Sequence, residues 1–192
     1  LVKELKNRKK QVLLTIHSIP EVNLKKYSED LSRVDKIVVH SQKDFEKLKQ
    51  GGINNVEIFT HGVKVFSDEN KEKLRQKLEI NHTPIIASHG LIHEHKGLLE
   101  TIEALKILKN DFPKILFLSI NAVNTDNSTS SAVFNQMKEK VRENNLVDNV
   151  IFVSDFIEKQ EIIKLLHIAD LIVLPYSDLQ EGASGAVRYS FA

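Results

Sequence analysis

The sequence contains no cysteine, and aromatic residues make up only 6% of its 192 residues. Without cysteine the chain can form neither a disulfide framework nor a thiolate metal site, which favours a reducing compartment. The net charge of +1 and the few aromatic side chains offer little to attract or stack nucleic acid, so we expect no nucleic-acid partner. No apolar run is long enough to span a bilayer and no signal-peptide pattern opens the chain, so we expect a cytoplasmic protein.

The first ten residues, LVKELKNRKK, are basic. A solvated helix face is the favoured interpretation, and peripheral contact with anionic lipid, hence membrane association, stays open as the alternative. A first residue that is leucine rather than methionine leads us to expect a piece of a longer protein.

Short apolar runs alternate with helix-period segments along nearly the whole chain. The predicted strands cover 11–18, 36–41, 55–62, 84–90, 114–120, 149–156 and 171–176, and the predicted helices cover 24–34, 42–50, 69–80, 97–112, 132–146 and 158–169. Strands that are apolar on both faces, each followed by an amphipathic helix, predict parallel sheets covered on both sides. The expected fold class is therefore α/β, with doubly wound, Rossmann-like parallel sheets.

The sequence pattern also predicts one amphipathic helix, one loop and one domain boundary. In the predicted helix 97–112, five residues share one stripe at spacings of three and four: Leu98, Ile102, Leu105, Leu108 and Phe112. A polar stretch at 121–131 predicts a loop before the next helix. Residues 63–69 mix turn formers with charge, so we place a domain boundary there and divide the chain into 1–65 and 66–192.

Ligands of such sheets bind at the carboxyl ends of the strands. Polar or glycine-bearing strand ends occur at four places: His17-Ser18, 60–62, 88–90 and the loop before Glu181. These four ends are therefore the predicted functional edge.

The stretch 88-SHGLIHEHKG-97 suits a phosphate group. Gly90 at a strand end lets a ligand approach the backbone, and Lys96 beside a helix start favours an anion. Neither the GxxxxGK[ST] motif nor the GxGxxG fingerprint is present. Three histidines in or beside this loop do not form HExxH, and the adjacent Lys96 disfavours a cation, so we expect no metal.

The stretch 181-EGASGAVRYSFA-192 is a second candidate for ligand contact. It falls short of the G-x-S-x-G elbow of serine hydrolases because Ala186 stands where glycine is needed. Amides at a helix start favour an anion, whereas the Glu181 carboxylate would repel one and suits neutral hydroxyl groups. A sugar attached to a diphosphate meets both demands.

Residues 85-IIASHGLIHEHKGLLETIEALKIL-108 and 150–192 resemble the C-terminal domain of GT-B retaining glycosyltransferases of family four, the glycosyl transferases group 1. The segments 13-LLTIHS-18 and 55-NVEIFTHGV-63 extend the resemblance toward the N-terminus. It implies transfer of a sugar from a nucleotide-diphosphate sugar with retention of configuration, in carbohydrate biosynthesis, without a metal or other cofactor. Residues 1–65 would be the last part of the acceptor domain, and 66–192 a donor domain truncated at its end.

The resemblance also implies roles for particular residues. His17 would lie beside the donor sugar, Lys96 would neutralise the departing diphosphate, and Glu181 would bind sugar hydroxyls; these three are the expected catalytic residues. The remaining expected donor contacts are Gly90, Gly182, Ala183, Ser184 and Gly185. The acceptor is left open among a saccharide, a lipid and a protein.

Three positions depart from the family pattern. Leu91 stands where arginine is usual, Tyr189 where a second glutamate is usual, and Ser184 where glycine is usual. These departures keep an alternative open, in which the chain is a degenerate, non-catalytic GT-B domain that acts as a scaffold or partner subunit. A sugar-nucleotide epimerase is a third, less favoured interpretation. Because the acceptor domain is incomplete, we expect no turnover by this stretch alone.

Overall fold

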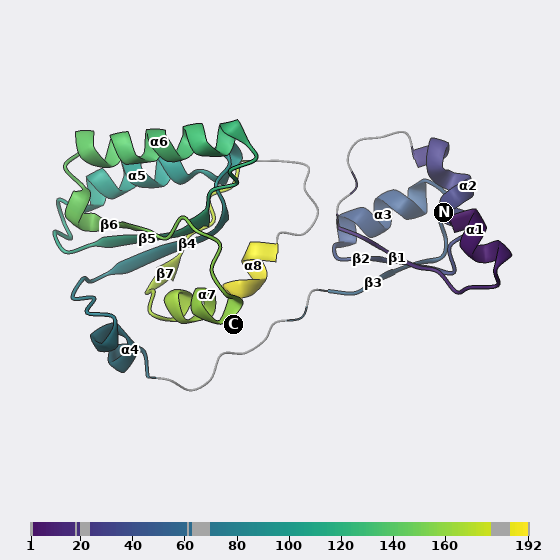
Figure 1. The fold of residues 1–192 in the computed structure, drawn as a ribbon, viewed down its shortest axis with the longest axis horizontal. Coiled ribbons are helices and arrows are strands. Elements are labelled where there is room, and N and C mark those ends of the chain that lie inside the picture. The colour runs from purple at the N-terminus through teal and green to yellow at the C-terminus, as the bar shows by residue number, and fades with distance from the viewer. Residues whose placement is uncertain are drawn as a thin grey trace. The chain divides into compact units, whose positions relative to one another are not determined.

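The computed structural model describes residues 2–17, 19, 24–60, 62, 70–177 and 185–191. They fall into two compact units, which we call unit 1, up to Gly62, and unit 2, residues 70–177 together with 186–191 (Figure 1). Each unit contains one parallel sheet with helices packed against it, which confirms the predicted α/β class. The assignment of residues 1–65 and 66–192 to an acceptor and a donor domain stays a prediction.

Unit 1 has a three-stranded parallel sheet in the order β1-β2-β3. Its strands are β1 (Leu13–Ile16), β2 (Lys36–Val39) and β3 (Val56–Ile58), and its helices are α1 (Val2–Asn7), η1 (Leu24–Tyr27), α2 (Ser28–Ser32) and α3 (Gln42–Gln50). The buried core of the unit consists of Ile19, Val34, Ile37, Val39, Leu48, Ile53 and Val56. Of the basic opening residues, Lys3 and Lys6 lie on α1, where Lys6 pairs with Asp35, and the others follow the helix.

Helix α3 begins where its sequence provides a cap. The Ser41 hydroxyl accepts a hydrogen bond from the Asp44 amide at 3.1 Å, which satisfies one of the amides at the helix start. Asp44 is buried, and its carboxylate accepts bonds from the Ser41 hydroxyl at 2.6 Å and the Ile19 amide at 3.2 Å. These bonds fix the turn that follows β2.

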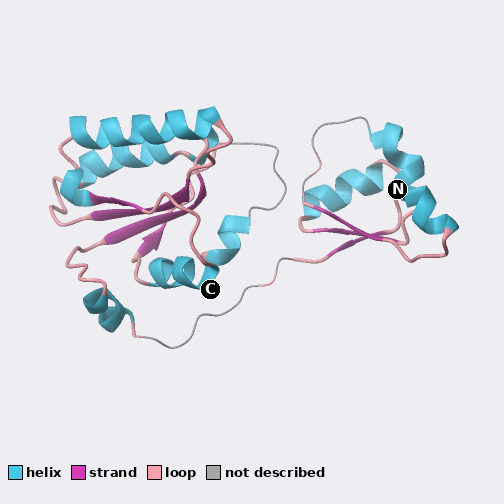
Figure 2. Ribbon diagram, in the orientation of Figure 1, coloured by secondary structure: helices cyan, strands magenta, loops and turns pink. Residues whose placement is uncertain are grey.

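Unit 2 has a four-stranded parallel sheet in the order β6-β5-β4-β7 (Figure 2). Its strands are β4 (Ile85–Leu91), β5 (Leu116–Ala122), β6 (Val150–Phe152) and β7 (Leu171–Ile172). Every residue of β5 is buried, as expected of a central strand covered on both faces.

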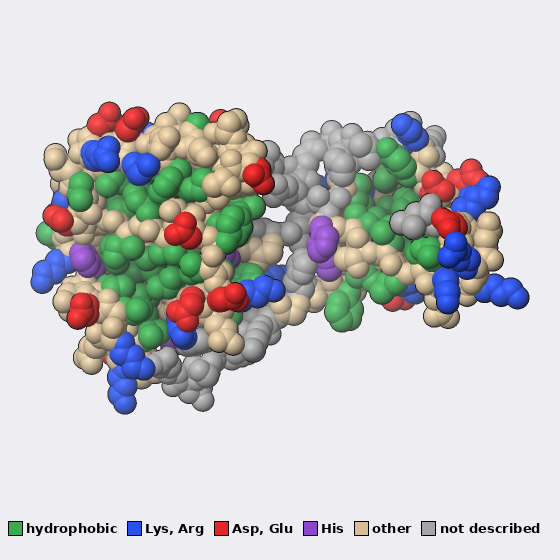
Figure 3. Space-filling model, in the orientation of Figure 1, with side chains coloured by type: hydrophobic (Ala, Val, Ile, Leu, Met, Phe, Trp, Pro, Cys, Tyr) green, Lys and Arg blue, Asp and Glu red, His purple; other side chains and the backbone are tan. Residues whose placement is uncertain are grey.

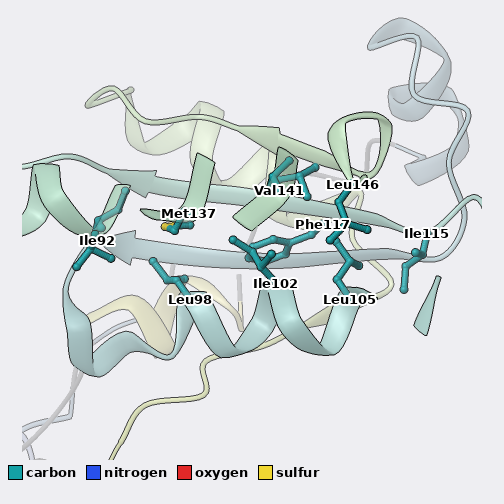
Figure 4. Packing of buried hydrophobic residues seen from close by; sticks show 11 residues of the cluster. Ile92, Leu98, Ile102, Leu105, Ile115, Phe117, Met137, Val141 and Leu146 are labelled. Carbon is teal, nitrogen blue, oxygen red and sulfur yellow. The ribbon is translucent and has the colours of Figure 1, made fainter. Parts of the chain in front are cut away.

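Helices cover both faces of this sheet. On one face lie α5 (Leu98–Leu108) and α6 (Ser128–Glu143), and on the other lie α4 (Lys71–Lys77), α7 (Lys159–His167) and α8 (Gly185–Tyr189). Figure 4 shows the core under α5 and α6, where Ile102 and Leu105 pack around Phe117. The doubly wound prediction is therefore confirmed for unit 2.

Several predicted boundaries are wrong, and the capping of α6 and the short β7 have a clear local reason. Helix α6 begins at Ser128, inside the predicted loop, because the Asn127 side chain accepts a hydrogen bond from the Thr129 amide and caps the helix there. Helix α5 ends at Leu108, so Phe112 leaves the stripe and is 47% exposed. Strand β7 has only two residues, because Pro175 lacks the amide that a longer ladder needs.

A carboxylate joins the amino end of the unit 2 sheet. Asp170 accepts hydrogen bonds from the Ile85 amide at 2.8 Å, Lys71 at 2.9 Å and Arg75 at 2.8 Å. Burial alone would raise the pKa of Asp170, but these three donors outweigh burial and lower the pKa to about 2. The carboxylate therefore ties α4 to β4 and β7.

We expect Asp170→Asn to destabilise unit 2 by about 1–3 kcal/mol near neutral pH, because Lys71 and Arg75 lose their counter-ion. The folded pKa is depressed, so the contribution of Asp170 is present above the ordinary value of 3.8 and is lost as pH falls toward about 2. Urea unfolding followed by circular dichroism at several pH values measures it.

The exposed pair Glu161–Lys164 provides the control, since Glu161→Gln should change stability by less than about 0.5 kcal/mol. A difference between the parent and Asp170→Asn that stays the same from neutral pH down to about 2 would contradict the assigned role.

Candidate functional site

The carboxyl ends of β4 and β5 lie side by side in unit 2. Gly90 pairs with Asn121 and Leu91 with Ala122. Gly90 has φ +144°, a conformation that side-chain-bearing residues rarely adopt. A Cβ atom at Gly90 would lie 3.9 Å from the Asn121 amide oxygen Oδ1, 4.0 Å from the Tyr176 hydroxyl and 3.7 Å from Cβ of Ala186. Gly90 therefore lies where β4, β5, the segment after β7 and helix α8 come close together.

The turn after β4 carries Lys96. The buried side chain of Ile92 anchors the turn, its amide donates to the Ala122 carbonyl at 3.0 Å, and residues Glu94–Lys96 form η2. The Lys96 ammonium nitrogen Nζ lies 3.8 Å from the centroid of the Tyr176 ring. Since Tyr176 also approaches Gly90, the predicted residues Gly90 and Lys96 lie at one site, which we call the edge cluster: Gly90, Lys96, Asn121 and Tyr176.

Buried hydrogen bonds hold the Asn121 side chain of the edge cluster in place. The Asn121 side chain is 2% exposed, and its amide group donates to the Ser88 carbonyl at 3.3 Å and to the Ser119 hydroxyl at 3.0 Å. A buried amide held by two such bonds has a fixed orientation. Asn121 was missed because it falls in the predicted loop 121–131, although it lies within β5. The signal that could have found it is a polar residue directly after an apolar strand.

His89 links the strand to helix α8. Its ring lies edge-on to the Tyr189 ring, with 5.3 Å between centroids, and its Nδ1 is 3.2 Å from the Ile120 carbonyl oxygen. Burial lowers the pKa of His89, and the Ile120 carbonyl only partly opposes this effect, so the ring is neutral at pH 7. Tyr189, at the position where the resemblance implies a glutamate, therefore contributes packing.

The remaining residues predicted in the range 66–192 are only partly placed. Gly185 is the first residue of α8, and a Cβ atom there would meet nothing within 4 Å. Glu181, Gly182, Ala183 and Ser184 lie outside the described residues. Leu91, at the position where the resemblance implies arginine, is 38% exposed at the end of β4.

Unit 1 has a polar edge of its own. His17 follows β1, and its ring centroid lies 5.0 Å from that of His40, which follows β2. The Nδ1 atom of His40 is 2.7 Å from the carbonyl oxygen of Phe59, which follows β3. His17 is exposed, and Figure 3 shows histidine side chains on the surface of this unit. His40 was missed, although the strand-end rule that selected His17 applies equally to it.

No metal centre is apparent in the described ranges, where no three His, Cys, Asp or Glu side chains gather closely enough to hold an ion. The rings of His93 and His95 stack on each other with 5.3 Å between centroids. The expectation that no metal is needed stays a prediction.

The parallel sheets, covered by helices and carrying their polar residues at the carboxyl edges, define a Rossmann-like α/β protein. Residues 70–187 match the family model described as glycosyl transferases group 1. The match covers more than half of the chain, so the chain belongs to the glycosyl transferases group 1 family.

Solved glycosyltransferase structures share the fold. HepE of Anabaena in complex with UDP is 15% identical, with a TM-score of 0.76 over 98% of this chain and 53% of that one. Sucrose-phosphate synthase of Thermosynechococcus elongatus is 18% identical, with a TM-score of 0.70 over 97% and 50%. A glycosyltransferase of Rickettsia africae is 20% identical, with a TM-score of 0.66 over 91% and 54%. These similarities confirm the predicted GT-B type of Rossmann-like fold.

The chain spans about half the length of these solved relatives. No curated protein matches its sequence. None of the helices within the described residues combines the length and apolar character that a bilayer crossing requires.

Proposed function

We propose that this chain supplies the donor-binding part of a retaining glycosyltransferase that uses a nucleotide-diphosphate sugar. The edge cluster carries the proposal, because it joins a glycine at a strand end with a lysine ammonium group at the carboxyl edge of a Rossmann-like sheet. Membership of the glycosyl transferases group 1 family supports it. So does the UDP bound to the structurally similar HepE.

Each part of the edge cluster has a task in the proposed reaction. The bare backbone at Gly90 admits the diphosphate close to the peptide, and Lys96 balances its charge. In the transfer step the bond between the anomeric carbon and the diphosphate oxygen breaks and a bond to the acceptor oxygen forms. The acceptor proton leaves with the nucleoside diphosphate. Negative charge grows on the diphosphate as the bond breaks, so a fixed ammonium group lowers the barrier.

Other assignments complete the proposal. His17 would meet the donor sugar from unit 1, Glu181 would bind its hydroxyl groups, and the loop 182–185 would bind phosphate oxygens. Lys96 would take the place of a divalent metal ion, so the activity should survive EDTA. The acceptor, peripheral membrane contact and inactivity of this stretch alone stay predictions.

Calorimetry with nucleoside diphosphates and their sugars tests the proposal. The full-length protein should release heat with at least one of UDP, GDP, ADP and dTDP, or with a sugar of that nucleotide. Absence of binding to all of these at millimolar concentration would count against the donor site. Transfer from a labelled donor to an acceptor, followed by determination of the anomeric configuration, tests retention and separates a transferase from an epimerase.

A second candidate function is a non-catalytic scaffold or partner subunit. Two observations favour it: an exposed leucine, Leu91, replaces the usual arginine, and Tyr189 packs against His89 where a glutamate is usual. In that case the full-length protein would bind its partner normally with Lys96 removed.

A further inference from the structure

Tyr176 lies close to two other members of the edge cluster, Lys96 and Gly90. The Lys96 Nζ atom lies 3.8 Å from the centroid of the Tyr176 ring, well inside the roughly 6 Å within which an aromatic face attracts a cation. The hydroxyl oxygen of the same side chain lies 4.0 Å from the position that a Cβ atom would take at Gly90. One side chain therefore reaches from the lysine to the end of β4.

The backbone around Tyr176 is held tightly against the Lys96 turn. A Cβ atom at Gly97, which has φ +65°, would lie only 2.2 Å from the Pro175 carbonyl oxygen. On the other side of Tyr176, the Ser177 amide donates to the His95 carbonyl at 3.0 Å. The Tyr176 amide itself donates to the Leu174 carbonyl at 2.8 Å, which closes a tight turn. The ring thus stands on a segment that is fixed to the turn carrying Lys96.

We propose that the ring of Tyr176 is a positioning residue for Lys96, which holds the ammonium group at the carboxyl edge of β4 before a nucleoside diphosphate arrives. The inference rests on the proposed function, since it concerns the same donor site. Tyr176 would act through Lys96 and would not itself bind the diphosphate.

The physical benefit of this arrangement is preorganisation. A lysine side chain has four flexible carbon–carbon links and loses much rotamer freedom when an anion fixes it. A ring that already restrains the ammonium group reduces this loss. The aromatic face covers one side of the ammonium group and does not itself consume an N–H donor.

The aromatic face, and not the hydroxyl group, carries the proposed effect. Phenylalanine has the same face, whereas leucine has a similar apolar bulk without it. Tyr176→Phe should therefore retain UDP affinity to within about twofold, and Tyr176→Leu should weaken it about 3- to 30-fold. Titration of the full-length protein with UDP by calorimetry measures both, with GDP and ADP as parallel probes.

A matched control comes from the other unit. Lys26 lies 5.8 Å from the centroid of the Tyr27 ring, which is also a lysine–tyrosine contact but is remote in sequence from the edge cluster. Tyr27→Leu should leave the affinity for UDP unchanged.

Two further measurements separate positioning from a general structural effect. Protons on the ε-carbon of Lys96 should show an upfield ring-current shift in NMR spectra of the ε-¹³C-lysine-labelled protein, with the signal assigned by its absence in Lys96→Met. The shift should persist in Tyr176→Phe and disappear in Tyr176→Leu. In a double-mutant cycle, Tyr176→Leu should have no further effect on UDP affinity once Lys96 is methionine.

The outcomes are distinct. Equal losses in the Phe and Leu variants, or no loss in the Leu variant, would overturn the inference and leave the donor site intact. Failure of the parent protein to bind UDP, GDP, ADP, dTDP and all of their sugars would instead contradict the proposed function. In that case the ring-current shift alone tests whether the ring holds Lys96. If the Leu variant does not fold, an upfield shift in both the parent and Tyr176→Phe supports the contact, and its absence from both contradicts the inference.

Discussion

Replacing Lys96 by alanine is expected to lower kcat/KM for sugar transfer by about 100- to 1,000-fold in the full-length protein. The ammonium group lies at the edge cluster, where negative charge would grow on the departing diphosphate. Removal of one preorganised charge from such a site costs most in the transition state, so kcat should fall more than the affinity for the donor. Steady-state kinetics with a labelled donor measures the two effects separately.

Lys106→Ala is the matched control, since Lys106 is an exposed lysine on the neighbouring helix α5. It should change kcat/KM by less than about twofold, because an exposed charge away from the site is largely screened by solvent. If Lys96→Ala leaves the activity of the whole assembly unchanged, the chain does not stabilise the leaving group and the scaffold function is favoured.

The second large effect is expected at Gly97, where alanine should destabilise unit 2 by about 3 kcal/mol or more. The added Cβ would lie 2.2 Å from the Pro175 carbonyl oxygen and 2.9 Å from the Pro175 ring carbon Cγ. The first neighbour is backbone, so no side-chain rotation relieves the overlap. The positive φ of +65° adds about 1–2 kcal/mol of strain. Urea unfolding followed by circular dichroism gives the loss.

Gly52→Ala isolates the backbone contribution. Gly52 has φ +82°, but a Cβ atom there would meet nothing within 4 Å, so this variant should lose only about 1–2 kcal/mol. Similar losses for the two variants would mean that Pro175 can move away at little cost. Because Gly97 follows Lys96 directly, the Gly97 variant should also bind UDP more weakly, whereas the Gly52 variant should not.

The sheet architecture was predictable because its signals are local. Runs such as 114–120 and 84–90 are apolar on both faces, and such runs are strands of a covered parallel sheet, as β5 and β4 are. The boundaries were less predictable, because they depend on single capping groups. Asn127 starts α6 four residues before the point that hydrophobic spacing alone indicated.

Gly90 and Lys96 could be proposed as neighbours from the sequence, since both follow the same strand. Tyr176 could not, because it is about eighty positions away along the chain and meets Lys96 only when β7 pairs with β4. The close approach of Pro175 to Gly97 is equally invisible to a linear pattern. A glycine before a helix indicates freedom of the backbone, but it does not say which segment occupies the space.

Strand β4 carries a titratable contact near each end. Near its carboxyl end the strand carries the neutral imidazole of His89, and at its first residue the Ile85 amide donates to Asp170. The pKa of His89 lies below its ordinary value of 6.5. As the pH falls below 6.5, the unfolded chain therefore binds a proton at this histidine before the folded protein does, which lowers the free energy of unfolding. The Asp170 end follows only between about 3.8 and 2. Acidification thus affects the carboxyl end of the strand at a higher pH than its amino end, so we expect mild acid to perturb the proposed donor site before it unfolds the protein.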